Sequence, residues 1–134
     1  MIYADTGIII RLIEGTDRVR DPIKHRLREM PEEDRLIATS RLSRLECRCK
    51  PLREKQEGLL RLYDAFFRAK EVVVVEIEGP VIEKATVLRA DVGLKTPDAI
   101  HAATAILCGA SAFWTTDQGF ARCPELNVEV FDVK

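Results

Sequence analysis

The sequence of 134 residues lacks the features that define several large classes of protein. No apolar run approaches the roughly 20 residues that cross a membrane. The N-terminus has no basic segment followed by an apolar one, so we expect neither a membrane protein nor a secreted one. Repeats, linkers and low-complexity segments are also absent, and 46% hydrophobic with 32% charged residues excludes a disordered chain. The sequence predicts one cytoplasmic domain over residues 1–134.

Zinc-binding and phosphate-binding motifs are missing as well. Of the four cysteines, only Cys47 and Cys49 lie close together, and they form no Cys-x-x-Cys pair. Neither of the two histidines completes a zinc pattern, so we expect reduced thiols. The phosphate loop or lysine that a receiver domain or a phosphotransferase needs is also absent, which argues against those doubly wound folds.

The net charge of −1 hides an uneven distribution. Residues 1–70 carry 16 basic and 12 acidic side chains, whereas residues 71–134 carry 5 basic and 10 acidic ones. The whole molecule would not attract nucleic acid, but a local basic face in the first half would. The alternative is that the arginines of the first half only make its helices soluble.

Short apolar runs alternate with helical periods along the chain. The runs predict strands at 2–5, 35–39, 71–77, 112–115 and 128–133. The periods predict helices at 6–14, 21–30, 40–49, 52–70, 79–91 and 96–109. Strands that alternate with helices imply a parallel sheet between layers of helices, which is an α/β fold.

Some of these boundaries depend on particular residues. Asp21 and Pro22 suit the N-cap and the first position of a helix. Ser40 suits the N-cap of the next helix. The four consecutive valines at 72–75 are typical of a parallel strand that is covered on both faces.

Four carboxylates differ from most other acidic residues, which lie on polar stretches: Asp5, Glu46, Asp98 and Asp117. Asp5 ends the first predicted strand and Asp117 closely follows the fourth. Asp98 lies in the first turn of a helix, where the helix dipole favours the ionised form. Parallel α/β proteins build sites at such strand ends and helix starts. Acids gathered there would repel one another unless protons or a cation compensated, which indicates a divalent metal.

Each of these residues also has a purely structural interpretation. Asp5 can cap the first helix, and both roles are compatible. Asp98 can be an ordinary helix-start residue, and Asp117 can begin a turn. Glu46 can be solvated. His101 lies one turn after Asp98, where a hydrogen-bonded packing role is favoured over a ligand role.

The helix that begins at Ser40 carries an apolar stripe, a basic side and one acid. Leu42 and Leu45 form the stripe, and Glu46 lies one step away from it. The basic side consists of Arg41, Arg44 and Arg48, of which the last two are neighbours at i, i+4.

The triplet Asp5-Thr6-Gly7 also occurs in the active sites of aspartic proteases. Those enzymes are all-β, and a small one must dimerise to pair two aspartates. The predicted helices of this chain argue against that assignment.

Four segments, in order along the chain, match the motifs of a known family: 2–6 (Ile-Tyr-Ala-Asp-Thr), 40–46, 85–104 and 115–120. Over essentially its whole length the chain resembles the PIN domain, and within that family the VapC-like toxins of prokaryotic toxin–antitoxin pairs. Two positions depart from the family pattern. Gly7 stands where asparagine is usual, and Thr116 stands where asparagine or serine is commoner.

The resemblance implies a three-layer α/β/α sandwich around a central parallel sheet. It also implies a metal-dependent endoribonuclease that uses Mg²⁺ or Mn²⁺, which prefer oxygen ligands. Asp5 and Asp98 would be direct ligands, and Glu46 and Asp117 would complete the cluster directly or through water. The residues that would orient carboxylates or water are Thr6, Thr115 and Thr116.

The same resemblance implies several partners. These are an RNA substrate, a VapB-like antitoxin and a second copy of the chain in a homodimer. The residues that would contact RNA phosphates, or acidic residues of the antitoxin, are Arg41, Arg44 and Arg48. Two other functions stay open, namely a non-toxin PIN nuclease in RNA processing and a PIN scaffold without catalytic activity. The four acids favour catalysis, and the lack of a second domain favours the toxin.

Overall fold

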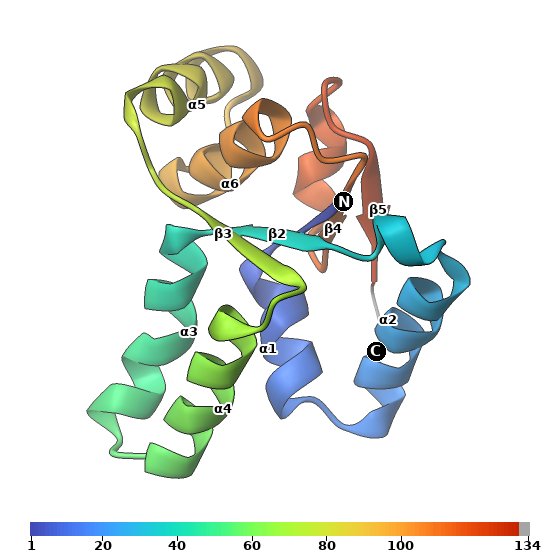
Figure 1. Ribbon diagram of the computed structural model, residues 1–134. Coiled ribbons are helices and arrows are strands. Elements are labelled where there is room, and N and C mark those ends of the chain that lie inside the picture. Colours follow the sequence, from blue (N-terminus) through green and yellow to red (C-terminus); the bar gives the residue numbers. More distant parts are fainter. Residues whose placement is uncertain (132–134) are drawn as a thin grey trace.

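The predicted apolar runs form one parallel sheet in the computed structural model, which describes residues 1–131 (Figure 1). The strand order is β3-β2-β1-β4-β5. The bounds are β1 (Ile2–Ala4), β2 (Ile37–Ser40), β3 (Val72–Val75), β4 (Ala112–Thr115) and β5 (Val128–Val130).

Helices cover both faces of this sheet. They are α1 (Thr6–Glu14), α2 (Asp17–Glu29), α3 (Arg41–Arg53), α4 (Glu57–Arg68), α5 (Gly79–Val92) and α6 (Thr96–Leu107). Two 3₁₀ turns, η1 (Glu32–Asp34) and η2 (Gln118–Arg122), complete the chain. Figure 1 shows α1 to α4 below the sheet and α5 with α6 above it. No helix among the described residues is long and apolar enough to span a membrane.

The alternation of side chains along each strand produces two separate cores. Ile2 and Ala4 of β1 pack with Ile8, Ile23 and other apolar residues on the side of α1 to α4. Tyr3 points to the opposite face and packs against α5 and α6. The predicted three-layer α/β/α sandwich is therefore confirmed.

The predicted start of α2 was wrong. The helix begins at Asp17, and Pro22 lies inside it rather than at its first position. The extended residue Thr16 precedes the helix, and its carbonyl accepts hydrogen bonds from the N–H groups of Val19 and Arg20 at 3.1 and 3.0 Å. These bonds start the helix five residues before the position that the Asp-Pro pair suggests.

The helix predicted over 52–70 is present as α4, but its predicted start is wrong, because α3 continues to Arg53 and the chain turns before α4. The N–H of Lys55 donates to Leu52 O at 3.3 Å, and the N–H of Gln56 donates to Pro51 O at 2.9 Å. This pattern is a Schellman motif, which places Lys55 in the left-handed region with φ of 57°. A glycine usually occupies that position, and because a lysine stands there, no glycine marks the turn in the sequence.

Three strand predictions need adjustment. β3 was expected to be covered on both faces, but it lies at the edge of the sheet and Val73 is 40% exposed. β2 begins at Ile37, two residues after its predicted start. β5 ends at Val130, and the predicted strand positions 132–133 lie outside the described residues.

The strand order creates a switch point beside the central strand, β1. The chain runs from β1 outward through β2 to β3, then returns to the other side of β1 to form β4 and β5. The carboxyl ends of β1 and β4 therefore meet where the direction of winding reverses. Parallel α/β proteins bind ligands at such a switch point.

Candidate active site

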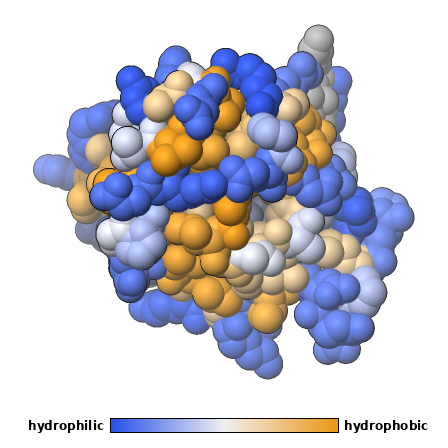
Figure 2. All heavy atoms as spheres, turned by 90° about the horizontal axis from the view of Figure 1, so that it is seen from above, coloured by the Kyte–Doolittle hydropathy of each residue, from blue (hydrophilic) through white to orange (hydrophobic). Residues whose placement is uncertain are grey.

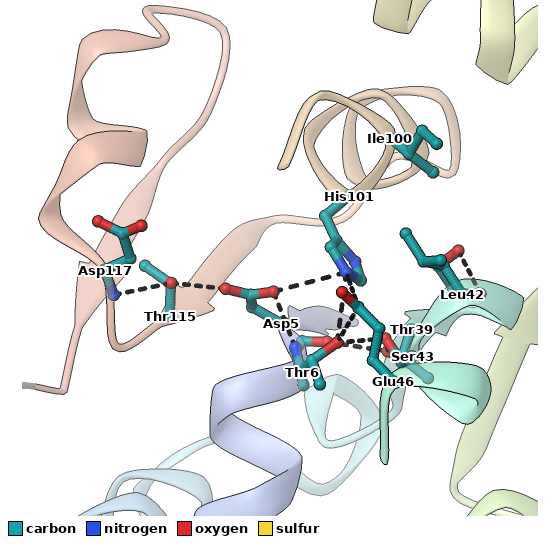
Figure 3. A network of polar contacts seen from close by, with 12 residues as sticks. Asp5, Thr6, Thr39, Leu42, Ser43, Glu46, Ile100, His101, Thr115 and Asp117 are labelled. Atoms are coloured by element: carbon teal, nitrogen blue, oxygen red, sulfur yellow. Dashed lines mark hydrogen bonds and ion pairs between the residues drawn. The ribbon is translucent and has the colours of Figure 1, made fainter. Parts of the chain in front are cut away.

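Asp5 lies at this switch point, directly after β1. Its Oδ1 accepts a hydrogen bond from the N–H of Thr6 at 2.8 Å, so Asp5 is the N-cap of α1. Its Oδ2 accepts from the Thr115 hydroxyl at 2.8 Å, across from the end of β4 (Figure 3). The side chain is 9% exposed, and these bonds fix its orientation. The capping interpretation of Asp5 is thus confirmed.

Thr115 connects two of the predicted site residues. Besides its bond to Asp5, its Oγ1 accepts the backbone N–H of Asp117 at 3.0 Å. Asp117 caps η2 by accepting the N–H of Gly119 at 2.8 Å, and its side chain is exposed. Figure 3 shows Thr115 between Asp117 and Asp5. The end of β4 therefore orients one buried and one exposed carboxylate.

Glu46 reaches the same region from α3, although not for the reason that the apolar stripe suggested. Leu45 is 64% exposed, whereas Ser43 and Cys47 are buried, so the predicted stripe is not the buried side of α3. Glu46 lies one turn after Ser43, on the side that faces α1. Its Oε1 accepts the Thr6 hydroxyl at 2.7 Å.

His101 supplies the second bond to Glu46. Its Nε2 lies 2.7 Å from Glu46 Oε1, and its Nδ1 lies 2.6 Å from the Tyr3 hydroxyl. Because a carboxylate only accepts, Nε2 donates to Glu46, which leaves Nδ1 as the acceptor for the Tyr3 hydroxyl. The ring is 2% exposed, which confirms the hydrogen-bonded packing role. His101 Nε2 is also 3.8 Å from Asp5 Oδ1, so this packing residue touches two site acids.

These bonds set the protonation of Glu46. Burial opposes its ionisation, but hydrogen bonds from His101 and Thr6 outweigh burial and hold the pKa of Glu46 below its ordinary value. Burial, followed by the charge of Asp5, raises the pKa of Tyr3 well above its ordinary value, so the phenol keeps the proton that it donates.

Asp98 lies in the first turn of α6, and the charges of the other acids affect its pKa. Burial raises its pKa, and the charges of Asp5 and Asp117 raise it further, while His101 acts in the opposite direction and Glu46 adds a smaller upward contribution. A carboxylate that is destabilised by three others belongs to one electrostatic cluster with them. The structure therefore brings all four predicted acids to the same end of the sheet.

The donor chemistry of this cluster suits a hard divalent cation, which prefers oxygen ligands and retains several waters. The side chains are not drawn tightly around one point, however. Among residues 1–131, no three histidine, cysteine or acidic side chains are close enough to surround an ion. Glu46 in particular is directed at His101 and Thr6.

The two departures from the family pattern lie against each other. Gly7 is the second residue of α1, and a Cβ built on it would lie 2.6 Å from Thr116 Oγ1. No larger residue fits at position 7 unless Thr116 moves. Glycine at position 7 therefore leaves the space that the Thr116 side chain occupies.

The three predicted RNA-contacting arginines are already paired within the chain. Arg41 forms an ion pair with Glu76. Arg44 Nη1 and Arg48 Nε lie 3.0 and 2.9 Å from the same oxygen of Asp64. The basic side of α3 exists, but local acids neutralise much of its charge.

Sequence reasoning missed the hydroxyl groups beneath the acids. Ser43 Oγ lies 2.7 Å from Thr39 Oγ1 and 3.2 Å from Thr6 Oγ1, and the Thr39 hydroxyl donates to Ala4 O at 2.9 Å. The two residues on each side of Glu46 in the sequence are apolar or basic, so they did not indicate this network. The small polar residues at the end of β2 were the only available signal.

Comparison with known proteins identifies the family. The model of the PIN domain matches residues 2–126. The chain belongs to the PIN domain family. The four motif segments of this PIN domain lie on β1 and the start of α1, on the end of β2 and α3, on α5 and α6, and on the end of β4 with η2. No curated protein matches the chain.

Solved structures with the same fold cover nearly the whole PIN domain. A toxin–antitoxin complex from Klebsiella pneumoniae is 26% identical, with a TM-score of 0.74 and 98% of each chain covered. VapBC2 from Rickettsia felis, bound to a DNA fragment from its promoter, is 21% identical, with a TM-score of 0.77 and coverage of 98% and 100%. VapC20 from Mycobacterium tuberculosis, a toxin that cleaves the sarcin-ricin loop, is 19% identical, with a TM-score of 0.75 and coverage of 96% and 99%.

Proposed function

We propose that this PIN domain is a metal-dependent endoribonuclease and the toxin of a VapBC-type toxin–antitoxin pair. The observation that carries the proposal is the electrostatic cluster of Asp5, Glu46, Asp98 and Asp117 at the switch point of the sheet. Burial, and after it the like charges of Asp5 and Asp117, raises the pKa of Asp98, and a divalent cation relieves such repulsion between carboxylates. The 26% identical toxin–antitoxin complex supports the toxin assignment.

The four acids would together hold the metal ion. Asp5, held by Thr6 and Thr115, and Asp98, at the start of α6, would hold Mg²⁺ or Mn²⁺. Glu46 and Asp117 would complete the set directly or through water. A bound ion would lower the pKa of water and neutralise charge on the scissile phosphate.

The supporting residues keep Glu46 ionised and orient Asp5. The Thr6 hydroxyl and His101 hold Glu46 as a carboxylate, which can accept a proton or coordinate but cannot donate. Thr115 aligns Asp5 with the backbone before Asp117. Thr116 packs against Gly7 and sets how closely the β4 end approaches α1.

The partner part of the proposal includes a VapB-like antitoxin and a second copy of the chain. Figure 2 shows the face formed by α5 and α6, where hydrophobic atoms lie on both sides of a hydrophilic band. Ile82 and Val87 of α5 and Leu107 of α6 are 44, 49 and 50% exposed. A cavity of about 510 Å³ lies between these helices. Apolar surface of this kind is typical of protein interfaces.

A cleavage assay tests the enzymatic part. Asp5→Asn and Asp98→Asn should each abolish cleavage of labelled RNA in Mg²⁺ or Mn²⁺, because each replaces a charged ligand by a neutral amide. Asp91→Asn, an exposed aspartate on α5, is the matched control and should retain full activity. Circular dichroism should report the same fold for all three. Full activity of Asp5→Asn and Asp98→Asn would falsify the catalytic assignment.

One observation favours a second candidate, a PIN scaffold without catalytic activity. Glu46 is bonded to Thr6 and His101, and no three ligands converge within the described part of the chain. Calorimetric titration with Mn²⁺ separates the candidates. An active nuclease should bind Mn²⁺, and Asp5→Asn should weaken this binding. An inactive scaffold should bind Mn²⁺ poorly both as wild type and as Asp5→Asn.

A further inference from the structure

Basic side chains are scarce in the second half of the chain, which makes their positions informative. Residues 71–131 contain four of them. Lys84 pairs with a carboxylate shortly before β5 at 2.8 Å, and Arg89 donates to a backbone carbonyl at 3.0 Å. The other two are Lys95 and Arg122.

Lys95 and Arg122 line the same cavity beside the acidic cluster. This cavity has a volume of about 210 Å³, and its walls also include Asp98, Asp117 and Phe120. Lys95 directly precedes α6, and Arg122 ends η2. Two cations from different loops thus open onto the same space as two site carboxylates.

Both cations are available to a ligand. Within residues 1–131, neither Lys95 nor Arg122 forms an ion pair with a carboxylate, unlike the three arginines of α3. Arg122 donates through Nε to Gly119 O at 3.2 Å, which leaves its terminal nitrogens for other bonds. A Cβ at Gly93 would lie 4.0 Å from Arg122 Nη1, so the guanidinium reaches from η2 towards the loop before α6.

RNA is a polyanion, so it needs cationic side chains such as Lys95 and Arg122 next to this acidic site in order to approach it. The four acids repel phosphates, and a strand that enters the cluster must be held by cations next to it. Arginine matches phosphate oxygens with its planar fork, and lysine adds a mobile point charge.

We propose that this cavity binds a phosphate of the RNA strand next to the one that is cleaved, through Lys95 and Arg122. The inference rests on the proposed nuclease function and extends it to the substrate. In this proposal Lys95 and Arg122 contact the RNA backbone at the active site. They take the role that the sequence assigned to Arg41, Arg44 and Arg48. Backbone contacts of this kind set the position of the strand and carry no base specificity.

Binding of RNA without cleavage tests the proposal. The probe is a short fluorescently labelled single-stranded RNA, measured by anisotropy in EDTA over a range of KCl concentrations. Lys95→Gln and Arg122→Gln should each weaken binding by about tenfold at low salt, since each removes one charge-assisted contact. Each should also lower the slope of log K against log salt by about 0.7, and the double variant by about twice that.

Matched controls come from the opposite end of the molecule. Lys50→Gln on α3 and Arg61→Gln on α4 remove the same charges from exposed positions, and neither should change the affinity or the slope. If the wild type binds RNA and both cavity variants bind with unchanged affinity and slope, the inference is wrong while the proposed function stands. If the wild type neither binds nor cleaves RNA, the proposed function fails and the inference fails with it.

Discussion

The contact between Gly7 and Thr116 gives a prediction whose sign the structure determines. Gly7 is the second residue of α1, and Gly58 is the second residue of α4. A Cβ at Gly7 would lie 2.6 Å from Thr116 Oγ1, whereas a Cβ at Gly58 would meet nothing closer than 4.0 Å. The same substitution at the same helical position therefore meets a side chain in one case and open space in the other.

The expected free energies follow from these distances. Gly58→Ala should stabilise the protein by about 0.4–1 kcal/mol, because alanine restricts the unfolded chain and strains nothing. Gly7→Ala gains the same amount but must displace the Thr116 hydroxyl, and overpacking of this kind costs about 1–3 kcal/mol. The net result should be a loss of about 1 kcal/mol, which lowers the melting temperature by about 3–5 °C for a chain of this size.

A double-mutant cycle isolates the contact. Chemical denaturation of wild type, Gly7→Ala, Thr116→Ala and the double variant should show a coupling free energy of at least about 1 kcal/mol. In the Thr116→Ala background, Gly7→Ala should be stabilising, as Gly58→Ala is in the wild type. A coupling below about 0.5 kcal/mol would refute the reasoning, because it would mean that Thr116 turns away without loss.

Two further predictions concern the acids and their support. Folding raises the pKa of Asp98 above its ordinary 3.8, so the stability that this group contributes is present below pH 3.8 and is lost as the pH rises through the raised value. In EDTA at neutral pH, Asp98→Asn should therefore melt at a higher temperature than wild type, with the difference vanishing near pH 3 and absent for Asp91→Asn; equal melting temperatures at pH 7 would contradict the cluster. Tyr3→Phe, which removes the donor to His101, should lower stability by about 1 kcal/mol and reduce kcat by about tenfold with little change in KM. The control Tyr63→Phe removes a buried bond to a distant glutamate and should affect stability alone, so an equal loss of kcat in both variants would show that Tyr3 has no positioning role.

The sequence contained enough information to place three of the four acids. Asp5, Asp98 and Asp117 adjoin strand ends or a helix start, and the sheet topology brings such positions together whatever the details of packing. The position of Glu46 was harder to derive, because it depends on which side of α3 is buried. That side is set by contacts with α1 and α4, and the exposure of Leu45 shows that the local apolar pattern indicated the wrong side.

The remaining errors have the same origin in distant contacts. A run of valines is compatible with an edge strand and with a central strand. Only the order of the strands in the folded sheet decides between the two. Lys55 adopts a glycine-like conformation because two backbone bonds at the end of α3 require it. The arginines of α3 looked available in the sequence because Asp64 and Glu76, which pair with them, are far away along the chain.

The bond between Thr115 and Asp5 joins residues that are 110 positions apart. During synthesis Asp5 emerges 110 residues before Thr115, whose hydroxyl orients it. A chain interrupted before β4 lacks the strand that pairs with β1 on that side, and so cannot hold Asp5 in place. For the proposed ribonuclease, this order of assembly means that the ribosome meets an oriented Asp5 only after β4 has been made.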